Sequence, residues 1–247
     1  MHKTDDLNPI LPEPGSPRYS ELDPTNFPEI LDLVLASEAE PAVITCRTYP
    51  NYPRWQLPKN RARPWVGLEK TLVARRSVQD LPTRFPSARR LGRILRFGHG
   101  SLASHHRGPV PSAGGLQGLE LYVVAWETSW LPAGVYHYDR GGHHLSQVKA
   151  SAARDGWRAQ IPSMSRISGG ALLWVVVGDR ACVTQKYGFL ADRCLMLEAG
   201  HLMQNLCLLT TSLGMATVPL GAFFQGWIAR ELSLPQTDVV LYVAVAG

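Results

Sequence analysis

One long apolar segment, from Phe189 to Leu213, most constrains what this chain can fold into. Within it, apolar residues recur at the three- and four-residue spacing of one helix face, and Gly214 follows as a typical helix stop. The members of this stripe are Leu195, Ala199, Leu202, Leu206 and Leu209. A helix this apolar cannot stand uncovered in water, so we expect it either in the core of a monomer or at a subunit interface.

A second segment, at 171–177, predicts a central strand because it is apolar on both faces. Five further segments have the composition of strands bounded by turn residues, and three show helical spacing. The strands are expected at 119–126, 134–138, 144–148, 215–219 and 239–245, and the helices near 68–73, 91–98 and 227–232. Because strands and helices are intermixed without strict βαβ alternation, the sequence predicts an α+β fold.

The first 65 residues differ from the rest and are expected to form a separate N-terminal part. Five prolines within residues 1–25 predict an extended arm. A short helix capped by Asn26 should follow, then a strand at 42–48 and a long ordered loop at 49–64. We therefore divide the chain into an N-terminal arm, short helix and ordered loop at 1–65 and a globular domain at 66–247.

Charge is distributed unevenly along the 247 residues, whose net charge is +5. Residues 1–46 hold nine acidic and two basic side chains, whereas residues 47–107 hold fourteen basic and two acidic ones. The basic segment should seek anions. Nucleic acid is not the expected partner, because no helix-turn-helix, zinc-finger, RRM or KH pattern is present. A solvated basic face, a phosphate pocket or contact with the acidic N-terminal segment fits as well.

No metal site is predicted, because the cysteines stand singly with no CxxC pair. They are Cys46, Cys182, Cys194 and Cys207, and we expect reduced, mostly buried thiols. The doublets His105–His106 and His143–His144 are expected in loops or at the surface, since neighbouring strand residues point to opposite faces. No apolar run approaches the roughly 20 residues that cross a bilayer, and none resembles a signal peptide, so we expect a soluble, cytoplasmic protein.

Three short segments combine glycine, small hydroxyl and charged residues, as sites for phosphate-bearing cofactors do. The first, RRSVQ at 75–79, offers guanidinium forks and a hydroxyl to a phosphate. The second, PSAGGLQGLELYVVA at 111–125, lets a flat ligand approach its backbone. The third, VPLGAF at 218–223, ends a strand in a turn whose amides could face a ring. Arginines at a helix end and plain glycine turns explain the segments singly without a ligand.

Together and in this order, the three segments resemble FMN-dependent proteins of the nitroreductase fold. More narrowly, they resemble the SagB-type azoline dehydrogenases, which oxidise thiazolines and oxazolines in modified peptides. The resemblance covers residues 66–247, and its specific parts are the second segment, GVYHYD at 134–139, KYG at 186–188 and LEAGHLMQNL at 197–206. It implies a nitroreductase-like fold with a central mixed or antiparallel sheet flanked by helices, in a homodimer with two active sites at its interface.

The family pattern implies a role for each matching position. The residues that would contact the FMN phosphate and ribityl chain are Arg75, Arg76 and Ser77, and Gln79 would contact the ring or the ribityl chain. The residues that would line the isoalloxazine ring from across the dimer interface are Pro111, Ser112, Ala113, Gly114 and Gly115. The backbone amides near the reactive edge of the ring would come from Pro219, Leu220 and Gly221. At the position of Gln79 the family more often has a basic residue. Beyond the position of Gly247, relatives commonly have a further basic residue that helps to bind the phosphate. We therefore expect FMN to be held less tightly here.

The activity that the resemblance implies is an FMN-dependent oxidation, in natural-product biosynthesis, that removes two hydrogens from a peptide azoline to give a thiazole or oxazole. Dioxygen would reoxidise the flavin. Lys186 and Tyr187 match the pair implicated in proton transfer. Both titrate near pH 10 when unperturbed, so either acts as a base at neutral pH only where its surroundings lower the pKa. The substrate would be a peptide or carrier-bound azoline, with a cyclodehydratase or synthetase as a partner.

Two alternatives stay open from the residues alone. A reductase that uses NAD(P)H to reduce nitro or quinone compounds is one, because such enzymes do not need the GxGxxG pattern that is missing here. A flavin-free scaffold subunit of a peptide-modifying complex is the other, because of the departure at Gln79. A surface lysine beside an amphipathic tyrosine likewise explains 186–187 without catalysis.

Overall fold

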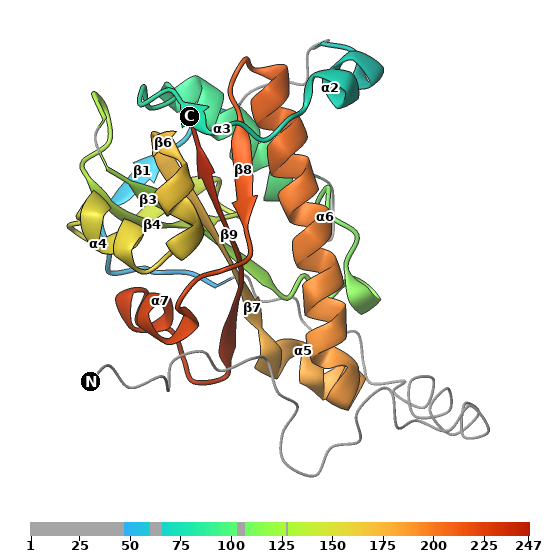
Figure 1. Ribbon diagram of the computed structural model, residues 1–247. Helices are drawn as coiled ribbons and strands as arrows, with labels where there is room; N and C mark the ends of the chain where they lie inside the picture. The colour runs from blue at the N-terminus through green and yellow to red at the C-terminus, as the bar shows by residue number, and fades with distance from the viewer. Residues whose placement is uncertain (1–46, 60–65, 103–106, 127) are drawn as a thin grey trace.

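The computed structural model describes residues 47–59, 66–102, 107–126 and 128–247, and a seven-stranded sheet forms its centre (Figure 1). The strands are β1 (Arg54–Gln56), β2 (Asp80–Leu81), β3 (Leu119–Ala125), β4 (Gly134–Asp139), β5 (His144–Lys149), β6 (Ser168–Gly169), β7 (Leu172–Asp179), β8 (Thr217–Leu220) and β9 (Asp238–Ala246). The main sheet has the order β1-β5-β4-β3-β7-β9-β8, and all its neighbours pair antiparallel. A short parallel pair joins β2 to β6.

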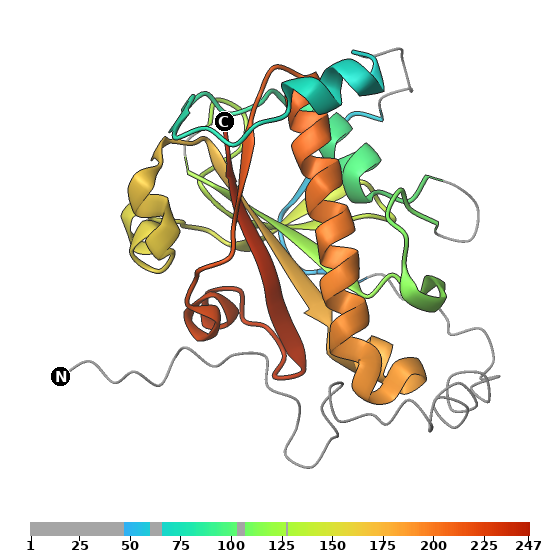
Figure 2. The same ribbon diagram turned by 45° about the vertical axis from the view of Figure 1, so that its right-hand side comes forward.

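Helices cover both faces of the main sheet. They are α2 (Leu68–Ala74), α3 (Ala88–His99), α4 (Arg154–Ala159), α5 (Arg180–Tyr187), α6 (Ala191–Ser212) and α7 (Gln225–Glu231), with 3₁₀ turns η4 (Ala113–Gly115), η5 (Pro162–Arg166) and η6 (Gly188–Leu190). Helices α3 and α6 lie on one face, and α4 and α7 lie on the other (Figures 1 and 2). This arrangement confirms the α+β class and the antiparallel form of the expected sheet.

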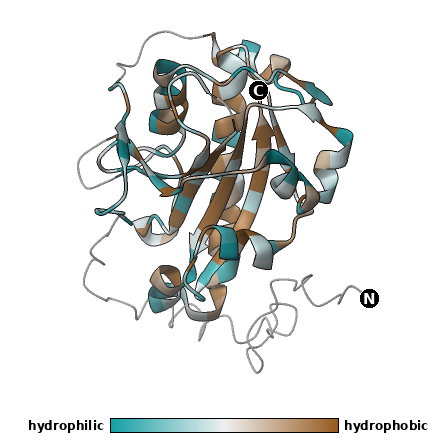
Figure 3. Ribbon diagram, turned by 90° about the vertical axis from the view of Figure 1, so that its left-hand side faces the viewer, coloured by the Kyte–Doolittle hydropathy of each residue, from teal (hydrophilic) through white to brown (hydrophobic). Residues whose placement is uncertain are grey.

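Strand β7 is covered on both faces, as its continuous apolar sequence predicts. Its residues 172–177 are fully buried. Leu172, Trp174 and Val176 join the apolar core beneath α6, while the alternate residues join the core on the opposite face. The hydropathy colouring shows the same pattern, with the central strands apolar along most of their length (Figure 3). One strand therefore ties the two halves of the core together.

Helix α6 matches the expected long helix and lies along the sheet (Figure 2). Its stripe is buried against the sheet at Leu195, Ala199, Leu202 and Leu206, and the helix ends at Ser212, two residues before Gly214. Helix α3 can approach closely because Gly98 leaves room for the side chain of Leu206. The core position of the stripe is thus observed within one chain. Among the described residues, no helix is both long and apolar enough to cross a membrane.

Several elements were not expected, among them the short pair of β2 and β6. The loop predicted at 49–64 contains β1, which pairs with β5 through three residues, and helices α4 and α5 occupy segments without apolar periodicity. β1 depends on a partner far away in the chain, which local patterns do not show. The other expected strands and helices form with end shifts of a few residues. The division at residue 65 remains a prediction, although β1 lies before it in the chain.

The prediction for the second histidine doublet holds only in part, because His143 lies in the turn before β5 but neither side chain is at the surface. His143 and His144 are buried, because the Tyr138 hydroxyl bonds to His143 Nδ1 at 2.8 Å, the Pro58 carbonyl lies 3.1 Å from His143 Nε2, and His144 belongs to β5. The cysteine prediction holds only in part: the three described cysteines are free, but Cys207 alone among them is buried.

Several N-terminal predictions lie outside the described residues. They are the proline-rich arm at 1–25, the helix capped by Asn26, most of the strand at 42–48, Cys46 and, later in the chain, the doublet His105–His106. The two described residues of that expected strand, 47 and 48, do not belong to a strand.

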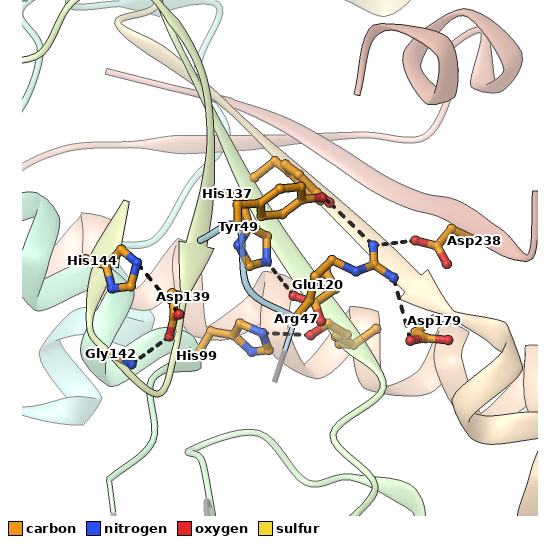
Figure 4. Close-up of polar contacts among 12 residues, drawn as sticks. Arg47, Tyr49, His99, Glu120, His137, Asp139, Gly142, His144, Asp179 and Asp238 are labelled. Carbon is orange, nitrogen blue, oxygen red and sulfur yellow. Dashed lines mark hydrogen bonds and ion pairs between the residues drawn. The ribbon is translucent and has the colours of Figure 1, made fainter. Parts of the chain in front are cut away.

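A buried polar network holds the start of the described chain against the sheet (Figure 4). Arg47 donates to Asp238 on β9 and lies 3.6 Å from Asp179. Beside it, His137 Nε2 lies 2.6 Å from the Glu120 carboxylate. Burial alone would raise the pKa of Glu120, but the hydrogen bond and charge of His137 and the charge of Arg47 hold it below its ordinary value. The network therefore stabilises an ionised carboxylate inside the protein.

His99, the last residue of α3, gives the fold a testable pH dependence. Its Nε2 lies 3.0 Å from the Leu119 carbonyl oxygen, so we assign the proton of the neutral ring to this nitrogen. Burial, supported by the positive charge of Arg140, lowers the pKa of His99 from 6.5 to about 4. Below pH 6.5 His99 therefore binds a proton in the unfolded chain but not in the folded protein, and the free energy of unfolding falls.

We predict that this single group removes about 2 kcal/mol of unfolding free energy between pH 7 and pH 4.5. His99→Gln keeps a donor for the Leu119 carbonyl but cannot titrate, so its urea-unfolding free energy should fall less over the same range. His201→Gln, at an exposed position on α6, is the control and should behave as the wild type. An identical pH dependence in His99→Gln would show that His99 is not the responsible group.

Candidate functional site

The loop at 111–115 lies directly against the lysine–tyrosine pair. Gly114 has φ of 57°, a left-handed conformation that favours glycine. A Cβ there would lie 2.9 Å from the Tyr187 hydroxyl and 3.1 Å from Lys186 Nζ. Such a Cβ would push these side chains away, so a residue without a side chain is what allows the pair and the loop to meet. Two of the predicted site segments are therefore neighbours within one chain.

Helix α5 determines where Lys186 and Tyr187 stand. The Asp179 carboxylate caps its start by accepting from the Cys182 amide at 3.0 Å. The helix ends at Gly188, whose φ is 50°. Both side chains of the pair are half-buried in its last turn.

A salt bridge ties α5 to the first turn of α6. The Arg180 guanidinium binds the Asp192 carboxylate through two nitrogens, with an Nε to Oδ1 distance of 2.7 Å. The salt bridge therefore fixes the position of the lysine–tyrosine pair relative to α6.

Glu198, on the buried face of α6, clamps the loop and was not expected as a site residue. Its Oε1 accepts hydrogen bonds from the Ala113 amide at 2.7 Å and from the Ser112 hydroxyl at 3.1 Å. The Ser112 hydroxyl in turn accepts from the Gln117 amide at 2.7 Å. The sequence did hold a signal, because Glu198 falls on the apolar stripe between Leu195 and Leu202. An acid at a buried helix position needs hydrogen-bond donors.

Burial dominates the electrostatics of this cluster. It raises the pKa of Glu198, against the opposing effect of the two hydrogen bonds from the loop. It also raises the pKa of Tyr187, and the nearby Cys194 and Glu198 add to that increase. At neutral pH the Tyr187 phenol therefore stays protonated and is a hydrogen-bond donor.

The arginine segment lies at the other end of α6. Arg75 directly follows α2 and is half-buried, whereas Arg76, Ser77 and Gln79 are exposed. The positive charge of Arg75 acts on the Cys207 thiol near the end of α6. The Gln79 carbonyl accepts from the Ser168 amide at 2.7 Å, which leads the chain into the pair of β2 and β6.

The third segment forms the end of edge strand β8. Pro219 and Leu220 pair with Ala244 and Val243 of β9, and Gly221 follows at an exposed position. No described atom lies within 4 Å of a Cβ built on Gly221, so the backbone there is open to a ligand.

The loop with the lysine–tyrosine pair and the arginine segment therefore form two separate groups within one chain. Cys207 follows Glu198 by nine positions in α6, which corresponds to roughly 14 Å along the helix. Near Glu198 lie the loop at 111–115 and the lysine–tyrosine pair. Near Cys207 lies the arginine segment. The structure does not bring the two groups together in a single chain.

Comparison with known families decides the class of protein. Residues 72–247 match the model of the nitroreductase family. The chain belongs to that family. Membership indicates an oxidoreductase of the flavin-dependent type, with a fold built as described above.

Individual relatives of this nitroreductase-family chain agree with the assignment. A candidate nitroreductase of Methanocaldococcus jannaschii is 28% identical over 176 residues, which are 71% of this chain and 89% of that protein. The crystal structure of a candidate nitroreductase of Ralstonia eutropha has a TM-score of 0.70 at 20% identity, covering 82% of this chain and 92% of that one.

A third similarity is to the Escherichia coli microcin synthetase McbBCD complex with truncated pro-MccB17 bound. The matched chain has a TM-score of 0.60 at 19% identity, covering 89% of this chain and 93% of that one. At such identities the structural neighbours show a shared fold. Within the described residues of this family member, no three His, Cys, Asp or Glu side chains are grouped to hold a metal ion.

The clamp predicts a specific effect of Glu198→Ala, which leaves the Ala113 amide and the Ser112 hydroxyl without their acceptor. We expect a loss of about 1 to 3 kcal/mol in unfolding free energy and faster hydrogen exchange of the amides at 112–117. Glu198→Gln keeps an acceptor oxygen and should lose less. Gln204→Ala, exposed on the same helix, is the control. Unchanged exchange in Glu198→Ala would disprove the clamp.

Proposed function

We propose that this protein is an FMN-dependent oxidase that converts peptide thiazolines or oxazolines into thiazoles or oxazoles. The observation that carries the proposal is the convergence of Gly114, Lys186 and Tyr187, which joins two segments typical of azoline dehydrogenases. A peptide substrate is supported by the structural neighbour described as a microcin synthetase complex with truncated pro-MccB17 bound. The azoline itself must come from a dehydrating ring closure, so we propose a cyclodehydratase or synthetase as a partner and a peptide or carrier-bound azoline as the substrate.

The residues present fit FMN. Guanidinium groups and a hydroxyl at 75–77 suit a phosphate dianion. The loop at 113–115 and the turn at Gly221 present backbone without side chains; a Cβ built on Gly115 or Gly221 would meet no described atom within 4 Å. Such a surface can accept a flat ring. FMN complexes are described for a structural neighbour from Exiguobacterium sibiricum, which supports the same cofactor here.

We assign the FMN-binding residues in two sets. The set for the phosphate, ribityl chain and reactive edge is Arg75, Arg76, Ser77, Gln79, Pro219, Leu220 and Gly221, and the set for the ring wall is Pro111, Ser112, Ala113, Gly114 and Gly115. Bound FMN would supply a two-electron acceptor next to the substrate.

The lysine–tyrosine pair handles the proton that leaves the ring. The raised pKa of Tyr187 keeps its phenol protonated, so Tyr187 donates a hydrogen bond that orients the azoline. Lys186 is then the proton acceptor of the pair. An amine accepts a proton only in its neutral form. Gly114 and Glu198 hold the loop so that both groups keep their positions.

A homodimer completes the site in this proposal. The two residue groups stand about 14 Å apart along α6, so one group comes from each subunit. Outward-facing apolar residues on α2 and α6 offer an interface: Val73 is 89% exposed, Leu68 67% and Leu197 58%. Exposed apolar surface of this kind is typical of contact regions.

Substitution of the pair tests the reaction. Lys186→Ala and Tyr187→Phe should each slow azoline oxidation by roughly 10² to 10⁴, the range for general acid–base groups, while the flavin absorbance at 350 to 550 nm stays intact. Gln185→Ala, exposed one residue away, is the control.

Three results would contradict the proposal. Full activity in both variants would remove the proposed proton acceptor. Rapid NADPH oxidation with a nitroaromatic and none with an azoline peptide would favour the reductase. A protein that stays colourless in excess FMN would favour the scaffold.

Coexpression of two impaired variants tests the composite site, at an FMN concentration that loads the wild-type site but not the Arg75→Ala site. Arg75→Ala should weaken FMN binding by about 1.5 to 3 kcal/mol, because it removes a charge-assisted phosphate contact. If one site takes Arg75 from one subunit and Lys186 from the other, mixed dimers of Arg75→Ala and Lys186→Ala contain one intact site. Random pairing should then restore about a quarter of the wild-type activity. No recovery in purified mixed dimers would place both residues in the same subunit's site.

A further inference from the structure

A cavity of about 750 Å³ lies away from the residues assigned to the flavin. Three parts of the chain line it: the segment 83–87 that leads into α3, the turn 128–130 between β3 and β4, and Arg154 at the start of α4. Its volume is within the range of small-ligand and peptide sites. None of the predicted cofactor or catalytic residues lines this cavity.

The cavity is built for negative charge. Arg84 and Arg154 line it, and no described lining residue is acidic. The structure shows no ion pair for either arginine among the residues it describes. Ser87 also lines it and caps α3, a helix of 12 residues with no acid in its first turn. The partial positive charge of the helix start adds to that of the arginines.

One of the two cations is already oriented. The Arg154 guanidinium carbon lies 4.5 Å from the ring centre of Trp126, and its Nη1 donates to the Gly169 carbonyl at 3.2 Å. Both contacts are with neutral groups, so they fix the guanidinium without cancelling its charge. Because the Arg154 side chain is already held in place, binding a carboxylate there costs little of its conformational entropy.

Two aromatic side chains give the cavity an apolar wall beside its positive charge. The rings of Phe85 and Trp130 lie 5.9 Å apart, and Trp130 Nε1 donates to the Pro86 carbonyl at 2.9 Å. Both rings are half-buried. The hydroxyls of Thr83 and Ser129 add single hydrogen-bonding groups along the rim. Charge, hydroxyls and an apolar wall thus lie side by side.

We propose that this cavity binds an acidic peptide segment of a partner. Its carboxylates would bind Arg84 and Arg154, and an apolar side chain between them would pack on Phe85 and Trp130. Guanidinium groups bind carboxylates through paired hydrogen bonds, and separate hydroxyls suit the backbone of an extended chain. The site is a second contact for a peptide, independent of whether the protein oxidises azolines.

Fluorescence anisotropy with a labelled peptide tests this site on the flavin-loaded protein. The probe is Glu-Phe-Asp-Leu-Glu, and the matched probe is Gln-Phe-Asn-Leu-Gln, which has the same shape without carboxylates. We expect the acidic probe to bind at least tenfold more tightly. Arg84→Glu should weaken it at least tenfold, and Ser129→Glu, which places an acid in the cavity at an exposed turn, should also weaken it.

Arg107→Glu is the control, because it makes the same charge change at an exposed position beyond the far end of α3. It should keep the affinity of the wild type. Equal weakening by Arg107→Glu, equal binding of both probes, or binding of inorganic phosphate but not of the acidic probe would each overturn the proposal. Flavin absorbance, recorded on the same samples, reports FMN binding separately, so a failure of the cofactor assignment is distinguishable from a failure of this site.

Discussion

The packing of α6 on one face of the antiparallel sheet determines where the candidate site groups lie. Its buried face contributes to the core through Leu202 and Leu206 and to the site through Glu198. Because one rigid helix carries both roles, the loop at 111–115 and the arginine segment are held at fixed heights along it. The separation of the two groups is therefore a property of the core, and in the proposed function a second subunit joins them.

Most of the main sheet could be predicted from the sequence because its strands carry their own apolar signal. β7 and α6 are the clearest cases, since a continuous apolar run and a helical stripe both record burial directly. β1 could not be found, because three residues with an exposed-intermediate-exposed pattern become a strand only by pairing with β5. Short elements of this kind depend on long-range partners that no local pattern contains.

The site was predictable only in part. Family motifs identified Lys186 and Tyr187, and the structure places them beside Gly114. Glu198 belongs to one of those motifs, yet its role depends on two donors that are 85 and 86 residues away in the chain. His143 was misjudged for the same reason, because its burial depends on contacts made by Tyr138 and Pro58. Motifs name residues, whereas burial and hydrogen bonding come from the folded chain.

The edges of the sheet limit how copies of this protein can associate. Edge strand β8 has four residues and contains Pro219, which has no amide N–H to offer another strand. The opposite edge, β1, is only three residues long and places exposed Arg54 at its start. Short edges with proline or charge protect a sheet against edge-to-edge aggregation. Growth of the sheet by strand addition is therefore disfavoured at both edges.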